Sequence, residues 1–194
     1  MIRVFLCGAH STGKTTLLHD VGKEVPDIKE ESEIARRVLN QMSPEERLKV
    51  VDYKNHPKDF EKLQRLILKR QCEVERENAN NGKDYIANRG IDPIVYAALY
   101  LGDDVKNTLL ALPTTQECIQ RYKTSFVFVI HPHKQCMKED GERINPVFSE
   151  LTRFTELLIQ ILDDLGIEYI PITVLDRSER CSIVVDHIRQ RQEL

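Results

Sequence analysis

The chain has 194 residues, of which 41% are hydrophobic and 30% charged, and its formal net charge at pH 7 is −3. This composition is typical of a folded domain, excludes a disordered chain, and gives no electrostatic reason to expect a nucleic-acid or anionic-membrane partner. The five cysteines are scattered, which favours reduced thiols, and no apolar run is long enough for a transmembrane segment. We therefore predict a single cytoplasmic domain over residues 1–194, without a signal peptide.

The first half of the sequence predicts one buried strand followed by several helices. Ile2–Leu6 is a short, mostly apolar run that ends at Gly8, as is typical of strands in parallel sheets. Ser43 and Pro44 are residue types that begin helices. Helical spacing of apolar residues predicts helices over Thr15–Val25, Glu30–Gln41 and 58–79. The last of these helices could serve as the face of a homodimer.

The second half of the sequence alternates strands with helices. The strand candidates are Tyr85–Ala87, Ser125–Ile130 and Ile167–Thr173, and the helix candidates are Ile94–Leu101, Val147–Leu165 and Ser178–Gln190. The polar segment 131–146 is long for a plain loop, so we expect a mobile lid or a short helix-loop there. Alternation of this kind predicts a mostly parallel sheet wrapped by helices. Gly8, Asn88 and His131 each follow a strand, so they should converge on one cleft.

Residues 8–15 match the pattern G-x-x-x-x-G-K-[ST] of a phosphate-binding loop. The glycines let the backbone turn successive N–H groups toward an anion, and the following helix adds the positive end of its dipole. In such a loop Lys14 reaches the β- and γ-phosphates of ATP, and the Thr15 hydroxyl is a ligand of Mg²⁺. The predicted phosphate-binding residues are Gly8, His10, Ser11, Thr12, Gly13, Lys14, Thr15 and Thr16.

The alternative is a chance match, which average residue usage allows in roughly one chain in a hundred of this length. A buried strand before the loop and a helix after it are the context that a functional loop requires, and both are expected here. The sequence therefore predicts an α/β fold of the P-loop NTPase type. In this fold a mostly parallel sheet forms the middle of a three-layer αβα sandwich, with a lid over about 131–146.

Three short motifs follow the loop in order along the chain. They are Glu33-Ile34-Ala35-Arg36, then Asn88-Arg89-Gly90-Ile91-Asp92 with Tyr96, and then Asp140-Gly141-Glu142-Arg143. With these motifs the chain resembles the P-loop kinase-like family that contains the nicotinamide riboside kinase domain of bacterial NAD-biosynthesis regulators. Eukaryotic relatives in that family are described as ATPase-like or phosphoinositide-binding. The chain is more distantly similar to deoxynucleoside and thymidylate kinases, and the resemblance covers almost all of it.

Charge and position indicate roles for the first of these motifs and for the arginine of the second. Glu33 could accept the proton of an acceptor hydroxyl, or it could be a surface carboxylate that starts a helix. Arg36 could hold an anionic group of the acceptor, or it could be a solvated ion-pair partner of Glu33. Arg89 follows a predicted strand at the cleft, where a guanidinium suits bidentate recognition of phosphate.

The remaining motif residues also have two interpretations each. Asp92 could bind acceptor hydroxyls, and it is also a favourable helix N-cap. Tyr96, one turn later, is expected in the core. Arg143 could act as an arginine finger in cis that neutralises charge on the transferring phosphoryl group. Alternatively, 134–143 is an exposed charged turn.

Asn88 departs from the family's pattern, because the related kinases carry an acid at this position that organises Mg²⁺ or takes the acceptor proton. An asparagine forms hydrogen bonds but offers neither a negative charge nor a useful base. Three explanations stay open. Glu33 or Asp92 could supply the base, the protein could bind nucleotide with little or no turnover, or Asn88 could be an introduced substitution.

These features predict an ATP- and Mg-dependent kinase that phosphorylates a hydroxyl of a nucleoside-like or related small metabolite. The predicted catalytic residues are Lys14, Glu33, Arg89 and Arg143, and the predicted acceptor-binding residues are Glu33, Arg36, Asn88 and Asp92. The alternative is a nucleotide-dependent binding module for a lipid head group or a protein partner, with weak or no turnover. Asn88 is the main support for this alternative.

Overall fold

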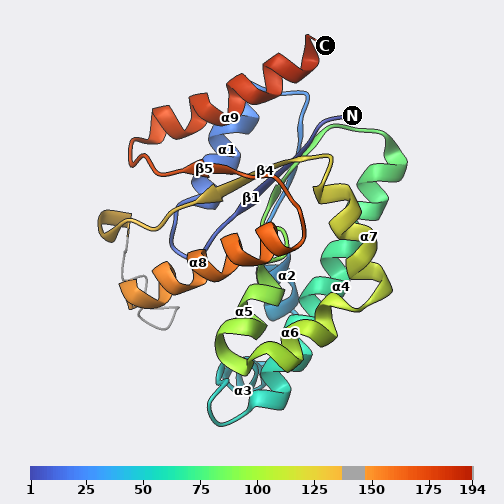
Figure 1. Ribbon diagram of the computed structural model, residues 1–194, viewed down its shortest axis with the longest axis vertical. Helices are drawn as coiled ribbons and strands as arrows, with labels where there is room; N and C mark the ends of the chain where they lie inside the picture. The colour runs from blue at the N-terminus through green and yellow to red at the C-terminus, as the bar shows by residue number, and fades with distance from the viewer. Residues whose placement is uncertain (137–146, 194) are drawn as a thin grey trace.

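The computed structural model describes residues 1–136 and 147–193, which form a parallel sheet with helices on both of its faces (Figure 1). The sheet of the described residues has the strand order β2-β3-β1-β4-β5, and all neighbouring strands are parallel. The strands are β1 (Arg3–Cys7), β2 (Lys29–Glu31), β3 (Tyr85–Asn88), β4 (Phe126–Ile130) and β5 (Ile170–Ile172). The predicted α/β fold with a parallel sheet is confirmed.

Helices cover the two faces of the sheet unequally (Figure 1). One face is covered by α1 (Lys14–Glu24) and α9 (Arg177–Gln192). The other face is covered by α4 (Pro57–Asn81), α5 (Asp92–Leu101), α7 (Pro113–Tyr122) and α8 (Phe148–Asp164). The remaining elements are the helices α2 (Ile34–Asn40), α3 (Pro44–Val51) and α6 (Asp103–Leu110) and the 3₁₀ turn η1 (Lys134–Cys136).

The central strand β1 contributes to both cores, because successive side chains of a strand point to opposite faces. Phe5 and Cys7 pack with α4, α5, α7 and α8, whereas Val4 and Leu6 pack with α1 and α9. All four side chains are fully buried. A strand that is buried on both faces has an almost continuous apolar sequence, which is why β1 and β4 can be recognised without a structure.

The predicted helix over Glu30–Gln41 is wrong at its start, because residues Lys29–Glu31 form the edge strand β2 and α2 begins only at Ile34. The strand pairs in parallel with β3, and the Lys29 N–H donates to the Asp84 carbonyl at 2.9 Å. All three residues of β2 are charged, so the strand carries no apolar signal and depends on its ladder with β3. The opposite edge strand, β5, contains Pro171.

The helix boundaries agree with the local signals in the sequence. Ser43 caps α3: its hydroxyl accepts from the Glu46 N–H at 3.2 Å, and the Glu46 carboxylate accepts from the Ser43 N–H at 2.8 Å. Gly82, with φ of 65°, ends α4. Of the segment expected to form a lid, 134–136 form η1, and 137–146 lie outside the described residues.

Gly8 permits a close backbone approach at the end of β1, which leads to a test. Its φ is 144°, and an added Cβ would lie 2.7 Å from the Ile130 carbonyl oxygen of β4. We expect Gly8→Ala to lower the free energy of unfolding by at least about 2 kcal/mol, because backbone strain and a clash act together. Urea denaturation measures this change.

Gly166→Ala is the matched control for this test. Gly166 also has a positive φ, 63°, but an added Cβ there meets nothing within 4 Å. The Gly166→Ala variant should lose only about 1 kcal/mol of its free energy of unfolding, from backbone strain alone. Equal losses in the two variants would contradict the steric argument.

Candidate functional site

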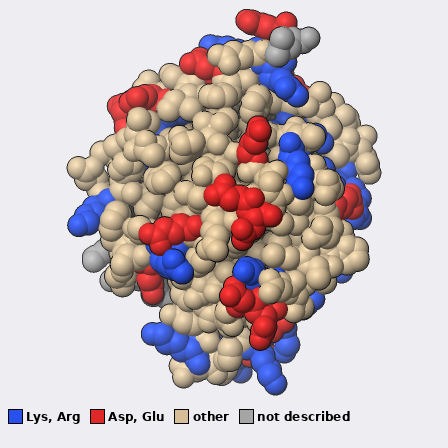
Figure 2. Space-filling model, in the orientation of Figure 1, with Lys and Arg blue, Asp and Glu red and all other residues tan. Residues whose placement is uncertain are grey.

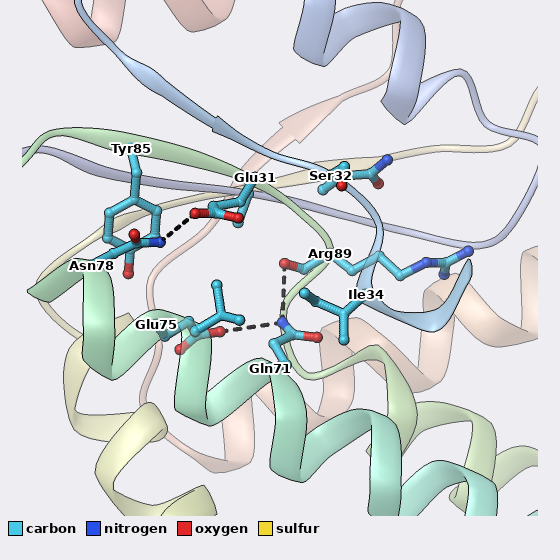
Figure 3. A pocket seen from close by; sticks show the side chains of 11 residues that line it. Glu31, Ser32, Ile34, Gln71, Glu75, Asn78, Tyr85 and Arg89 are labelled. Carbon is cyan, nitrogen blue, oxygen red and sulfur yellow. Dashed lines mark hydrogen bonds between the residues drawn. The ribbon is translucent and has the colours of Figure 1, made fainter. Parts of the chain in front are cut away.

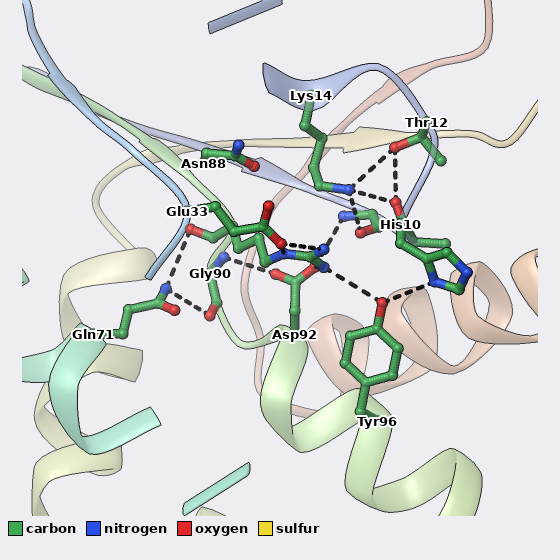
Figure 4. Close-up of polar contacts among 12 residues, drawn as sticks. His10, Thr12, Lys14, Glu33, Gln71, Asn88, Gly90, Asp92 and Tyr96 are labelled. Carbon is green, nitrogen blue, oxygen red and sulfur yellow. Dashed lines mark hydrogen bonds and ion pairs between the residues drawn. The ribbon is translucent and has the colours of Figure 1, made fainter. Parts of the chain in front are cut away.

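Two turns that follow neighbouring strands form the candidate site (Figure 4). One turn is the phosphate-binding loop between β1 and α1, and the other connects β3 to α5. Leu6 of β1 pairs with Asn88 of β3, and the Arg89 N–H donates to the Leu6 carbonyl at 3.0 Å. The two turns therefore leave the carboxyl edge of the sheet side by side, where parallel α/β sheets bind ligands. Of the three residues expected to converge, Asn88 contacts the loop that begins at Gly8 through Thr15. The His131 N–H instead donates to the Ile172 carbonyl of β5.

The phosphate-binding loop contains three residues with positive φ. Gly8, Ser11 and Gly13 have positive φ values of 144°, 59° and 87°. For Ser11 this conformation is uncommon, and such residues concentrate in loops that hold ligands. The Thr12 hydroxyl donates to the Ala9 carbonyl at 2.9 Å and closes the loop internally. Gly13 is the N-cap of α1, so the loop leads directly into the positive end of that helix.

Lys14 folds back onto the loop that it follows. Its Nζ donates to the Gly8 carbonyl at 2.8 Å, to the Ala9 carbonyl, and to the Thr12 hydroxyl at 3.2 Å. The side chain is buried, and this burial, followed by the nearby Arg89 charge, lowers the pKa of Lys14 to about 7. A phosphate in the loop would supply the negative charge that this ammonium group lacks.

Thr15 and Asn88 form a direct link between the two turns. The Asn88 Nδ2 donates to the Thr15 hydroxyl at 2.9 Å. The Asn88 Oδ1 is buried and has no hydrogen-bond partner among the described residues. An unpartnered buried oxygen costs free energy, so the position fits a ligand that brings a donor or a cation. Nucleotide-bound Mg²⁺, which takes oxygen ligands and keeps several waters, fits these two side chains.

The guanidinium of Arg89 is the buried centre of the site. Its Nε and Nη2 lie 2.9 and 2.7 Å from Glu33 Oε1, and its Nη1 lies 3.4 Å from Asp92 Oδ1. The backbone φ of Arg89 is 96°, which is strained for a residue with a side chain. Gln71 of α4 fixes this turn, because its Nε2 donates to the Arg89 and Gly90 carbonyls at 3.2 and 2.7 Å.

The expectation that Asp92 caps α5 is wrong. Asp92 is the first residue of the helix and makes no capping bond there. Its carboxylate instead accepts from the Gly90 N–H at 2.8 Å and from the Gly8 N–H at 3.3 Å. Asp92 is completely buried and ties the phosphate-binding loop to the turn after β3.

His10 and Tyr96 extend this polar network. The Tyr96 hydroxyl lies 3.2 Å from His10 Nδ1 and 3.5 Å from Arg89 Nη1. The Tyr96 ring also packs against Phe154 of α8, with centroids 4.6 Å apart. Tyr96 was expected only in the core, but it has a core face and a hydroxyl in the site.

The other predicted residues lie at the periphery. Arg36 is exposed, and its Nε lies 3.9 Å from Glu33 Oε2, which matches the solvated ion pair weighed above. Thr16 is exposed in the first turn of α1. Arg143 lies outside the described residues. Within the described ranges, no group of three or more His, Cys, Asp or Glu side chains could hold a metal ion by itself.

A polar pocket continues from the Arg89 turn along the inner side of α4 (Figure 3). It is lined by Glu31, Ser32, Ile34, Gln71, Val74, Glu75, Asn78, Tyr85, Ala87, Asn88 and Arg89. Burial raises the pKa of the Glu75 carboxyl, although hydrogen bonds from Tyr122 and Gln71 oppose this rise. Gln71 and Glu75 were not among the residues predicted from the sequence. The signal that could have identified them is a polar residue at a buried position of an amphipathic helix.

Two further observations concern the charge on the surface and the apolarity of the helices. On the face in Figure 2, Lys and Arg side chains are interspersed with Asp and Glu side chains. In the part of the chain that the structure describes, no helix is both long and apolar enough to cross a bilayer.

Solved structures with the same fold include several small-molecule kinases. Deoxyadenosine kinase from M. mycoides, bound to the products dCMP and dCDP, has a TM-score of 0.64 at 12% identity and covers 97% of this chain and 100% of its own. NadR in complex with NAD and AMP-PNP has a TM-score of 0.66 at 20% identity, and the match spans all of this chain but 50% of NadR. Shikimate kinase from Acinetobacter baumannii with shikimate has a TM-score of 0.53 at 15% identity, covering 98% and 94%. These likenesses establish a P-loop kinase-like fold.

No curated protein sequence matches the chain. A family model described as an AAA domain matches residues 3–180. This range contains both turns of the candidate site, namely the phosphate-binding loop and the turn after β3, and also the first turn of α9. The chain therefore belongs to the AAA domain family, with a P-loop kinase-like fold.

Proposed function

We propose that this protein is a P-loop kinase that transfers the γ-phosphoryl group of ATP to a hydroxyl of a small, nucleoside-like metabolite. The observation that supports this most strongly is the joining of two features at one sheet edge. The phosphate-binding loop meets a charged cluster of Glu33, Arg89 and Asp92 beside it. A simple nucleotide switch needs the loop but not a second charged cluster where an acceptor would bind.

The nucleotide side of the reaction belongs to the loop. Lys14 and the first N–H groups of α1 would hold the phosphates, with His10, Ser11 and Thr16 lining the same loop. Thr15 would be a ligand of Mg²⁺, and the Asn88 amide oxygen would accept from one of its waters. The bound ion would neutralise charge on the phosphate oxygens. Lys14, Arg89 and the bound ion would bind the transferring phosphoryl group more strongly as negative charge develops on its oxygens.

The acceptor side belongs to the Arg89 cluster. The Asp92 carboxylate accepts from two backbone N–H groups and pairs with the Arg89 guanidinium. We therefore assign Asp92 the role of positioning the two turns of the site. Glu33 is half-buried and is the cluster's carboxylate nearer to solvent. Glu33 would hold the acceptor hydroxyl in line with the phosphate, and Arg89 would stabilise the transferring group. We propose Arg143 as an additional arginine finger and Arg36 as a contact to an anionic part of the acceptor.

A nucleotide-dependent binding module is the second candidate, and Asn88 supports it. A neutral amide beside Thr15 lacks the charge that a Walker-type acid brings to Mg²⁺. Phosphoryl transfer depends mostly on positioning and electrostatics, so the loss of one acid slows the reaction rather than abolishing it. For this reason we favour the kinase.

The first experiment measures ADP release from Mg-ATP with and without a panel of acceptors. The panel contains nicotinamide riboside, nucleosides, nucleoside monophosphates, sugars and inositol compounds. We expect one class to stimulate release at least about tenfold, and Lys14→Ala to abolish the stimulation because the phosphates lose their buried cation. Lys23→Ala, on the exposed last turn of α1, is the control. Tight nucleotide binding without stimulation by any acceptor would favour the binding module.

A second prediction concerns Asn88. We expect Asn88→Asp to raise turnover with the stimulating acceptor by about tenfold or more, because a carboxylate beside Thr15 strengthens the Mg²⁺ site. The measurement is kcat at saturating Mg-ATP together with the apparent Kd for Mg²⁺. Asn107→Asp, at an exposed position of α6, is the control. Unchanged Mg²⁺ affinity in Asn88→Asp would show that position 88 does not serve the ion.

A third prediction follows from the lowered pKa of Lys14, about 7 in the ligand-free site. At pH 8 much of the free protein carries a neutral Lys14, and bound phosphates favour the charged form, so binding takes up a proton. At pH 6 the group is already charged and uptake by Lys14 disappears. Nucleotide affinity should therefore weaken as pH rises from 7 to 9.

Calorimetry in buffers of different ionisation enthalpy measures this proton uptake. The wild type should take up close to one proton more than Lys14→Met when ADP binds at pH 8.5, where ADP itself is fully ionised. Equal uptake in the two proteins would show that Lys14 stays charged throughout.

A further inference from the structure

Arg180 of α9 lies behind the phosphate-binding loop and is not part of its sequence motif. Its Nη1 donates to the Thr12 carbonyl at 2.9 Å, and its Nε donates to the Val174 carbonyl at 2.7 Å. An added Cβ at Gly13 would lie 3.3 Å from the same Nη1. The side chain is 5% exposed, although it belongs to a helix with a mostly polar sequence. Arg180 therefore joins the loop, the segment after β5 and the helix α9.

The charge of Arg180 has no carboxylate partner among the described residues, and its Nη2 has no hydrogen-bond partner there. The acidic residues nearby have other partners. Asp176 caps α9 by accepting from the Glu179 N–H at 2.8 Å, and Asp20 binds Arg177 at 2.6 and 2.7 Å. An unpaired cation at this level of burial is costly, so it indicates that an anion is expected close by.

The bond to Thr12 also controls the direction of a neighbouring N–H group. In a planar trans peptide the carbonyl and the N–H point in opposite directions. Arg180 binds the Thr12 carbonyl, so it also fixes the orientation of the Gly13 N–H of the same peptide, which points the opposite way. Gly13 has no side chain that could do this, and its φ of 87° is open to several alternatives.

We propose that Arg180 is a positioning residue of the nucleotide site: it orients the Thr12–Gly13 peptide, and the phosphates of a bound nucleotide supply the counter-charge that it lacks. The proposal rests on the nucleotide-binding part of the proposed function and does not depend on any acceptor. Arg180 adds to Lys14 and Arg89 a further buried cation, which acts on the phosphates through the loop. It also makes nucleotide binding sensitive to the segment after β5, through the Val174 carbonyl.

The test measures the Kd of a fluorescent ADP analogue with Mg²⁺, without acceptor, for three variants. Arg180→Gln keeps a polar donor but removes the charge, and we expect it to weaken binding by about tenfold or more. Arg180→Lys keeps the charge but lacks the planar fork that binds both carbonyls, so it should lose less affinity than Arg180→Gln without matching the wild type. Arg177→Gln, one turn earlier on the same helix in an exposed ion pair, is the control and should stay within about twofold.

Urea denaturation of the nucleotide-free proteins separates this role from a purely structural one. Removing an unpaired buried charge should leave the midpoint of Arg180→Gln unchanged or higher, while the stabilisation by added ADP shrinks. The proposal is overturned if Arg180→Gln binds ADP like the wild type, or if the Lys and Gln variants lose affinity equally. It is also overturned if Arg180→Gln fails to fold or loses stability in step with affinity.

Lys14→Ala in the same binding assay distinguishes two kinds of failure. If Lys14→Ala loses affinity and Arg180→Gln does not, the nucleotide site stands and only the role of Arg180 is refuted. If neither variant changes affinity, nucleotide does not bind in this loop, and the proposed function fails with it.

Discussion

The ion cluster around the Arg89 guanidinium is the interaction on which the rest of the site depends. Glu33, which precedes α2, and Asp92, at the start of α5, approach it from two parts of the chain. Because Asp92 also accepts from the Gly8 N–H, the cluster sets the position of the phosphate-binding loop as well. Removal of either carboxylate would leave the buried Arg89 charge short of a partner. The nucleotide side and the acceptor side of the site therefore cannot be altered independently.

The parts of the structure that could be predicted from the sequence are those with local causes. The loop motif, the apolar runs of β1 and β4 and the capping box at Ser43 each carry their signal within a few residues. The parts that could not be predicted depend on distant partners. The charged strand β2 exists because β3 lies beside it, and Asp92 reaches the Gly8 N–H because β1 and β3 pair side by side. Gln71 and Arg180 likewise bind backbone carbonyls far away in the sequence.

Side chains of the site satisfy much of the site's own polarity. Lys14 binds carbonyls of its own loop, and Asn88 binds the Thr15 hydroxyl. A nucleotide must exchange these contacts for contacts to its phosphates and metal ion, so its net affinity is smaller than a count of new hydrogen bonds implies. The gain comes from groups that the protein leaves incomplete, among them the Asn88 Oδ1.

The two edges of the sheet have a consequence for self-association. An open strand edge can template pairing with another molecule, and proteins block such edges with charges or proline. Here β2 consists of Lys29, Glu30 and Glu31, and β5 carries Pro171 at its centre. Both edges are short and poorly suited to adding a foreign strand. Copies of this chain are thereby protected from fibril-like stacking, and contacts between them would be made by helices rather than by extension of the sheet.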